Sequence, residues 1–129
     1  MSGYLLDTHA LVWWLADDAR LPATAREVIA NPMSRVFVSS ASIWEAGIKR
    51  ALGKLDLATD VPLAEIANDE GFDPLPITHD HAAAAADLPP HHRDPVDRML
   101  VAQAVHENLV LVSGDEQVVR YDVPVIWSG

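Results

Sequence analysis

Short apolar runs alternate with segments of helical pattern along this chain, and the clearest of these runs are continuous rather than alternating. They lie within the strands expected at residues 4–6, 35–39 and 109–113, and they end before Ser39 and Ser113 in the second and third of these. A strand with apolar side chains in succession is buried on both faces, as parallel strands are when helices cover both sides of their sheet. The pattern therefore predicts an α/β fold in which helices surround a central parallel sheet.

The remaining elements follow from turn and capping signals. Helices are expected at residues 8–17, 21–30, 41–52, 62–70, 78–86 and 94–107, and further short strands near residues 75–77 and 123–127. Residues 88–93 are expected to form a loop, since Pro89 and Pro90 lie within them. A chain of 129 residues without an internal repeat is expected to form a single domain, residues 1–129.

Composition removes several classes of function. The chain has no cysteine, which excludes disulfides, thiolate metal ligands and cysteine nucleophiles. It has no apolar run of membrane-spanning length, so we expect no membrane segment. Residues 1–15 carry no Lys or Arg, so we expect no secretory signal. We therefore expect a cytoplasmic location. A formal charge of −10 is unsuited to coating nucleic acid, although it suits bound cations or a basic protein partner.

Acids and small hydroxyls follow the three apolar runs, where ligands of open α/β sheets gather. These residues are Asp7, Thr8, Ser39, Ser40, Ser113 and Asp115, with Glu45 further along the helix after the second run. Glycine-rich phosphate loops and the G-x-S-x-G nucleophile motif are absent from the chain. Carboxylates suit Mg²⁺ or Mn²⁺, and such ions activate water and stabilise the displacement at a phosphodiester.

A structural role competes with the functional one at each acid. Asp94 precedes Pro95 and is expected to cap a helix, with Asp97 in the first turn of that helix. Asp7 either caps the helix that follows it or faces a ligand, because a carboxylate at this position contributes nothing to a core.

Two further acids have similar alternatives. Glu45 can pair with Lys49 on an exposed helical face, and Asp115 can be a turn residue after Gly114. The histidines at positions 79, 81, 91 and 92 are expected at the surface, and the tryptophans at positions 13, 14 and 44 in core or dimer contacts.

Four segments in this order resemble the PIN-domain ribonucleases, and more narrowly the VapC toxins of bacterial VapBC toxin–antitoxin systems. They are LLDTHALVWWL, SSASIWEAGIKRALGKL, HHRDPVDRMLVAQA and LVLVSGD. The resemblance implies a PIN-like three-layer sandwich, with helices on both sides of a central parallel sheet. This fold agrees with the one that the apolar runs predict.

The resemblance also implies a catalytic, metal-binding site. Its four acids are Asp7, Glu45, Asp97 and Asp115, with Thr8, Ser113 and Asp94 as supporting residues. The family's third acid falls on Asp97, which leaves Asp94 as the helix cap. Ser113 stands where relatives often have Thr.

Resemblance to VapC implies a Mg²⁺-dependent endoribonuclease toxin, with Mn²⁺ as a possible substitute. Such proteins cleave RNA with metal-activated water, form homodimers and are silenced by a cognate VapB-like antitoxin whose tail enters the acidic groove. RNA binding would need a basic strip, and the candidates are Lys49, Arg50, Lys54, Arg93 and Arg98.

Two alternatives remain open at this point. A receiver-like phosphoacceptor domain also carries acids at its strand ends, but it needs a Lys after a late strand, and residues 109–115 contain none. A catalytically inactive PIN-like binding module is expected to have lost one of the acids, and this chain has lost none.

Overall fold

The computed structural model describes residues 3–127, and its sheet is parallel throughout. Five strands lie in the order β3-β2-β1-β4-β5. They are β1 (Gly3–Leu6), β2 (Arg35–Ser39), β3 (Asp73–Leu75), β4 (Val110–Val112) and β5 (Val125–Ile126). The predicted α/β fold is confirmed, and the continuous apolar runs do form the central strands.

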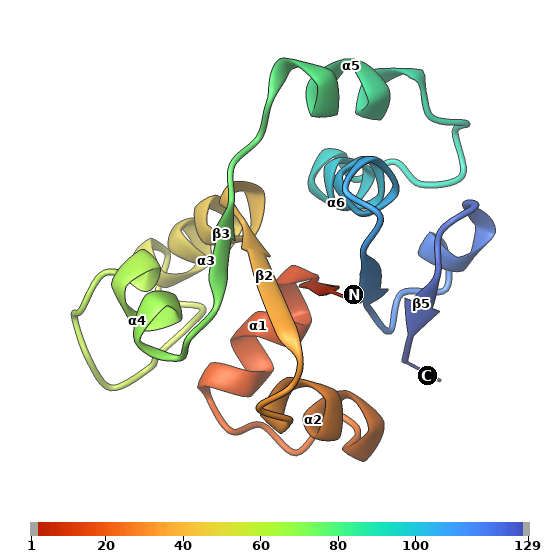
Figure 1. Ribbon diagram of the computed structural model, residues 1–129. Helices are drawn as coiled ribbons and strands as arrows, with labels where there is room; N and C mark the ends of the chain where they lie inside the picture. The colour runs from red at the N-terminus through yellow and green to blue at the C-terminus, as the bar shows by residue number, and fades with distance from the viewer. Residues whose placement is uncertain (1–2, 128–129) are drawn as a thin grey trace.

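Six α-helices connect the strands (Figure 1). They are α1 (Thr8–Leu15), α2 (Ala23–Ala30), α3 (Ser40–Ala51), α4 (Leu63–Asp69), α5 (His79–Asp87) and α6 (Pro95–His106). A short 3-10 helix, Val118–Arg120, precedes β5 and has no counterpart in the sequence-based prediction. Among residues 3–127, no helix has both the length and the apolar character that a membrane crossing needs.

The third strand lies at Asp73–Leu75 rather than at residues 75–77. Its partner is the end of β2, with Leu75 opposite Ser39. Pro76 has no N–H to donate beyond that point, so the ladder stops there. Pro74 is tolerated inside the strand because β3 lies at the edge of the sheet.

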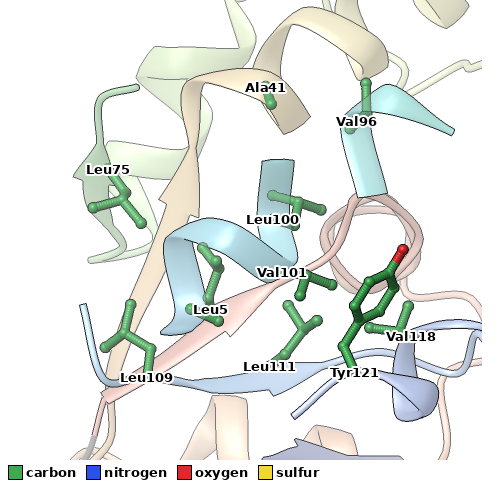
Figure 2. Close-up of a cluster of buried hydrophobic side chains, with 11 residues drawn as sticks. Leu5, Ala41, Leu75, Val96, Leu100, Val101, Leu109, Leu111, Val118 and Tyr121 are labelled. Carbon is green, nitrogen blue, oxygen red and sulfur yellow. The ribbon is translucent and has the colours of Figure 1, made fainter. Parts of the chain in front are cut away.

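Each face of the sheet carries its own apolar core. Leu5 and Leu111 pack with α6 and the segment after β4, as Figure 2 shows with Leu100, Val101 and Tyr121. The residues next to them in each strand point the other way: Leu6 and Val112 pack against α1 and α2. Helix α5 packs on α6, on the side of α6 away from the sheet (Figure 1).

The strand order places a crevice beside β1. The chain leaves β1 for β2 on one side, and after β3 it returns to β4 on the other side of β1. In open α/β sheets, such a reversal of direction leaves space for a ligand at the carboxyl ends of the strands. Leu6 of β1 lies opposite Val112 of β4, so Asp7 and Ser113 emerge side by side at this edge.

Candidate functional site

Asp7 is buried at the end of β1, with 5% of its surface exposed. Its Oδ1 accepts a hydrogen bond from the Ala10 N–H at 2.8 Å, so Asp7 is the N-cap of α1. Burial raises the pKa of the carboxyl, and the charge of Asp115 adds to this effect, while hydrogen bonds from Ala10 and Ser113 oppose it. Asp7 therefore caps a helix and also stands within electrostatic reach of another acid of the candidate site.

The Asp94-Pro95-Val96-Asp97 segment begins α6. Asp94 is the N-cap, and its Oδ1 accepts hydrogen bonds from the N–H groups of Val96 at 2.8 Å and Asp97 at 3.2 Å. The predicted capping role of Asp94 is confirmed. The Asp97 carboxyl lies on the first turn and takes no part in the cap, and its pKa is raised to about 7, chiefly by burial and next by the charge of Asp94. The charges of Asp7 and Asp115 also raise this pKa, whereas His92 lowers it.

Asp115 lies across from Asp97, with His92 between them. The Nε2 atom of His92 is 2.7 Å from Oδ2 of Asp115 and 3.2 Å from Oδ2 of Asp97. Each of the three side chains offers one atom that could ligate a metal, and these three atoms all lie within 4.8 Å of one another. Asp115 is also a turn residue, because its Oδ1 accepts the Gln117 N–H at 2.7 Å and its own N–H donates to Ser113 Oγ at 3.1 Å.

The expectation of surface histidines is wrong at two positions. The His92 side chain is only 14% exposed because it lies between two carboxylates. His81 is 1% exposed: its Nδ1 accepts the Thr78 N–H in a capping box, and its Nε2 lies 2.8 Å from Glu107. Two of the carboxylates that these histidines contact, Asp115 and Glu107, lie 23 and 26 residues away in the chain, so the sequence alone does not show those contacts.

Helix α3 carries Glu45 along a groove beside the site. Glu45 is half-buried and lines a cavity of about 370 Å³ with Trp44, Lys49 and Asp94. Thr8 links the starts of two helices, because its hydroxyl donates to Ser42 Oγ at 3.2 Å. Within residues 3–127 no ion pair joins Glu45 to Lys49, so the alternative structural role of Glu45 is not seen.

The tryptophans fall into two groups. Trp13 and Trp14 pack against the core on the α1 side of the sheet, as predicted. Trp44 is 66% exposed on α3, so it does not belong to the core, and its part in a dimer stays a prediction.

Two arginines of the expected basic strip are engaged within the protein. The Arg98 guanidinium donates to the carbonyl oxygens of Ala85, Ala86, Leu88, Pro89 and His92. Arg50 likewise donates to the carbonyls of Thr59 and Val61. Because both guanidiniums bind backbone carbonyls, neither is a candidate for binding RNA. Arg93, Lys49 and Lys54 remain the candidates.

A divalent cation fits the donor set of this site. The carboxylates of Asp7, Asp97 and Asp115 lie close together: the charges of Asp7 and Asp115 raise the pKa of Asp97, and the charge of Asp115 raises the pKa of Asp7. Like charges at this separation oppose ionisation, and a cation among them relieves the repulsion. The donors are hard oxygen atoms, which suit Mg²⁺ and Mn²⁺.

Substitutions at the two carboxylates of the Asp-Pro-Val-Asp segment should have different effects on cleavage and stability. We expect Asp94→Asn to keep both cleavage activity and stability, because Asn caps a helix about as well as Asp. Asp94→Ala should lower the free energy of unfolding by about 1 kcal/mol, since two N–H groups of α6 lose their acceptor. Urea unfolding and an RNA cleavage assay check both variants. Loss of cleavage in a fully stable Asp94→Asn would show that this carboxylate belongs to the site.

The chain belongs to the PIN-domain family, whose model matches residues 4–124. This membership confirms the resemblance and excludes the receiver-like alternative. The chain is 31% identical over 123 residues to ribonuclease VapC22 of Mycobacterium tuberculosis, covering 91% of this chain and 90% of that relative. This similarity agrees with the narrower resemblance to VapC proteins.

Solved structures share the fold at lower identity. VapBC of Salmonella typhimurium in its DNA-bound form has a TM-score of 0.71 and 19% identity, covering 98% of each chain. VapBC2 of Rickettsia felis, bound to a DNA fragment from its promoter, has a TM-score of 0.69 and 15% identity, covering 97% of this chain and 98% of that one.

Proposed function

We propose that this protein is a metal-dependent endoribonuclease and the toxin of a toxin–antitoxin pair. The observation that carries the proposal is the convergence of Asp7, Asp97 and Asp115 at the carboxyl ends of β1 and β4. The ribonuclease activity named for a relative of 31% identity supports it. Such a toxin would act in the cytoplasm, where its RNA substrates are.

The secondary structure holds each proposed ligand in place. The cap on α1 fixes Asp7, the first turn of α6 presents Asp97, and the turn after Ser113 orients Asp115. Glu45 is the fourth proposed ligand and reaches the groove from α3. A bound Mg²⁺ or Mn²⁺ would supply an activated water and stabilise the charge that develops on the phosphodiester.

RNA is proposed to approach along the same groove. Lys49 and Lys54 line it, and Arg93 is exposed on the loop before α6. Cationic side chains at these positions would bind the phosphates on either side of the cleaved bond. These three cations are few, so we propose that the metal makes most of the interaction with the phosphates.

Metal removal tests the function directly. We expect purified protein, free of antitoxin, to cleave RNA with Mg²⁺ and to lose all detectable cleavage in excess EDTA, with recovery when Mg²⁺ or Mn²⁺ is restored. The physical reason is that the carboxylates alone repel the phosphate and cannot stabilise its developing charge. Gel analysis of a defined RNA measures the rate.

An Asp97→Asn preparation, purified in parallel, is the control for a contaminating nuclease. Cleavage that persists in EDTA while the Asp97→Asn preparation is inactive would contradict the metal mechanism. A protein that binds RNA but cleaves none with either ion would instead indicate the inactive PIN-like binding module.

A VapB-like antitoxin and a second copy of this chain are the proposed protein partners. Trp44 and Ile48 on α3 and Leu52 at its C-cap are exposed, in the groove that Glu45 and Asp94 also line. Apolar and acidic groups together suit a partner with apolar and basic side chains. Arg is the expected basic residue, because its planar guanidinium can engage two carboxylate oxygens at once.

A further inference from the structure

The His92 imidazole lies between the two carboxylates that are proposed to share a cation. Its Nε2 is 2.7 Å from Asp115 Oδ2 and 3.2 Å from Asp97 Oδ2. The contact with Asp115 is a hydrogen bond, and the contact with Asp97 is within ion-pair distance. The imidazole therefore stands between two of the carboxylates that would hold the metal.

The hydrogen bonds of the ring determine which nitrogen carries the hydrogen. The N–H of Asp94 donates to Nδ1 of His92 at 3.0 Å, so Nδ1 is an acceptor. In the neutral ring the hydrogen must then be on Nε2, which donates to Asp115. A histidine that ligates a metal normally donates its second ring N–H to an acceptor. His92 has the opposite arrangement, because its second nitrogen faces a donor.

The backbone on which the ring is mounted is held from two sides. The N–H of His92 donates to the Tyr121 hydroxyl at 2.9 Å, and that hydroxyl donates to the Pro89 carbonyl at 2.8 Å. Arg98 donates to the carbonyls of Pro89 at 3.1 Å and His92 at 3.4 Å. With the backbone anchored in this way, the ring can leave the carboxylates only by rotation of its side chain.

We propose that His92 occupies the cation position of the metal-free protein and is displaced from Asp97 and Asp115 when the metal binds. This inference rests on the metal site given under Proposed function. The Nε2–H group donates a hydrogen bond to Asp115 and lies beside the Asp97 carboxylate while no cation is present. The same group excludes a metal ion from the space between them.

The displacement makes metal binding weaker than the carboxylates alone would allow. A ligand that binds one conformer only has an apparent affinity reduced by the fraction of protein in that conformer. Rotation of His92 breaks its hydrogen bonds to Asp115 and Asp94 and its close contact with Asp97, so the open conformer is the minor one. A variant without the His92 ring has no closed conformer to compete with metal binding.

Mn²⁺ binding by variant proteins tests the displacement without an activity measurement. Free Mn²⁺ is followed by electron paramagnetic resonance for wild type, His92→Ala and His91→Ala, with Asp97→Asn to identify the site. We expect His92→Ala to bind Mn²⁺ about tenfold more tightly or better, as for an open conformer populated to about 10%. His91→Ala, which removes a ring from the same loop, should bind as wild type does.

The outcomes separate the displacement from the metal site itself. Equal or weaker Mn²⁺ binding by a folded His92→Ala, with wild-type binding intact, would overturn the displacement alone. No Mn²⁺ binding by any of the proteins would overturn both the displacement and the metal site.

Nuclear magnetic resonance of the wild-type protein gives a result that does not depend on a variant. Histidine ring spectra of the metal-free protein should place the His92 hydrogen on Nε2 and show it protected from exchange with water. Saturating Mg²⁺ should abolish this protection at His92 and leave His81 unchanged, because His81 bonds to Glu107 instead. A His92 Nε2–H that stays protected at metal saturation would overturn the displacement.

Discussion

Asp97→Asn is expected to abolish RNA cleavage while leaving the fold intact. The change removes a charged oxygen ligand but keeps the size of the side chain, and Asp94 still caps α6. Loss of metal-assisted stabilisation of the phosphate is worth several kcal/mol, so the rate should fall by roughly 10³-fold or more. Single-turnover cleavage of a defined RNA measures the loss.

Asp60→Asn, on the exposed loop before α4, is the matched control, because it removes the same charge outside the proposed ligand set. It should cleave RNA at the wild-type rate. Cleavage by Asp97→Asn within about tenfold of wild type, equivalent to only about 1.4 kcal/mol, would contradict the assignment of Asp97 as a ligand.

The same substitution should stabilise the metal-free protein, and more so at high pH. The pKa of Asp97 is raised from 3.8 to about 7 in the folded protein, chiefly by burial. Between these two values the folded state holds more protons than the unfolded state, so the free energy of unfolding falls as the pH rises through this range. Above pH 7 the full penalty for ionising Asp97 is present, and Asn carries none.

Urea unfolding in EDTA at pH 5 and pH 8 measures this effect. Asp97→Asn should exceed wild type by roughly 1–3 kcal/mol at pH 8 and by much less at pH 5. Added Mg²⁺ should remove the advantage of the variant, because the ion stabilises only a protein that keeps its ligands. An advantage of the same size at both pH values would show that Asp97 is not the titrating group.

The sheet and the strand ends could be predicted because they depend on local patterns. Buried parallel strands require apolar residues on both faces, and residues 35–39 and 109–113 supply them. Helix caps depend on adjacent residues, so Asp94 before Pro95 was enough to place the start of α6. The strand β3 was misplaced by two residues because register depends on the partner strand, and Pro74 gave no local sign of pairing at an edge.

The surroundings of the acids could not be predicted from the sequence, because they depend on contacts between distant segments. His92 meets Asp115 only when the loop before α6 folds against the turn after β4. From the sequence, Arg98 is a candidate for binding RNA phosphates. In the folded protein its guanidinium instead donates to backbone carbonyls at the end of α5 and in the loop after it. Charge and spacing alone do not show whether an Arg serves a ligand or the backbone.

Asp7 has two roles that mutagenesis can separate. Both Asp7→Asn and Asp7→Ala should reduce cleavage by roughly 10³-fold or more, since each removes a charged ligand at the end of β1. Their stabilities should differ. The amide oxygen of Asn can still accept the Ala10 N–H and cap α1, whereas Ala leaves that buried N–H without its acceptor.

In EDTA at pH 8, Asp7→Asn is expected to be more stable than both wild type and Asp7→Ala. Burial raises the pKa of Asp7, so ionisation destabilises the folded protein above the usual pKa of a carboxyl, and Asn is free of that penalty. Ala should unfold about 1 kcal/mol more easily than Asn because of the lost cap. Urea unfolding measures the stabilities of the three proteins, and the cleavage assay tests whether Asp7 is also a metal ligand. If Asp7→Asn cleaves RNA as wild type does, capping alone accounts for the carboxylate at the end of β1, and the metal site must be assigned without it.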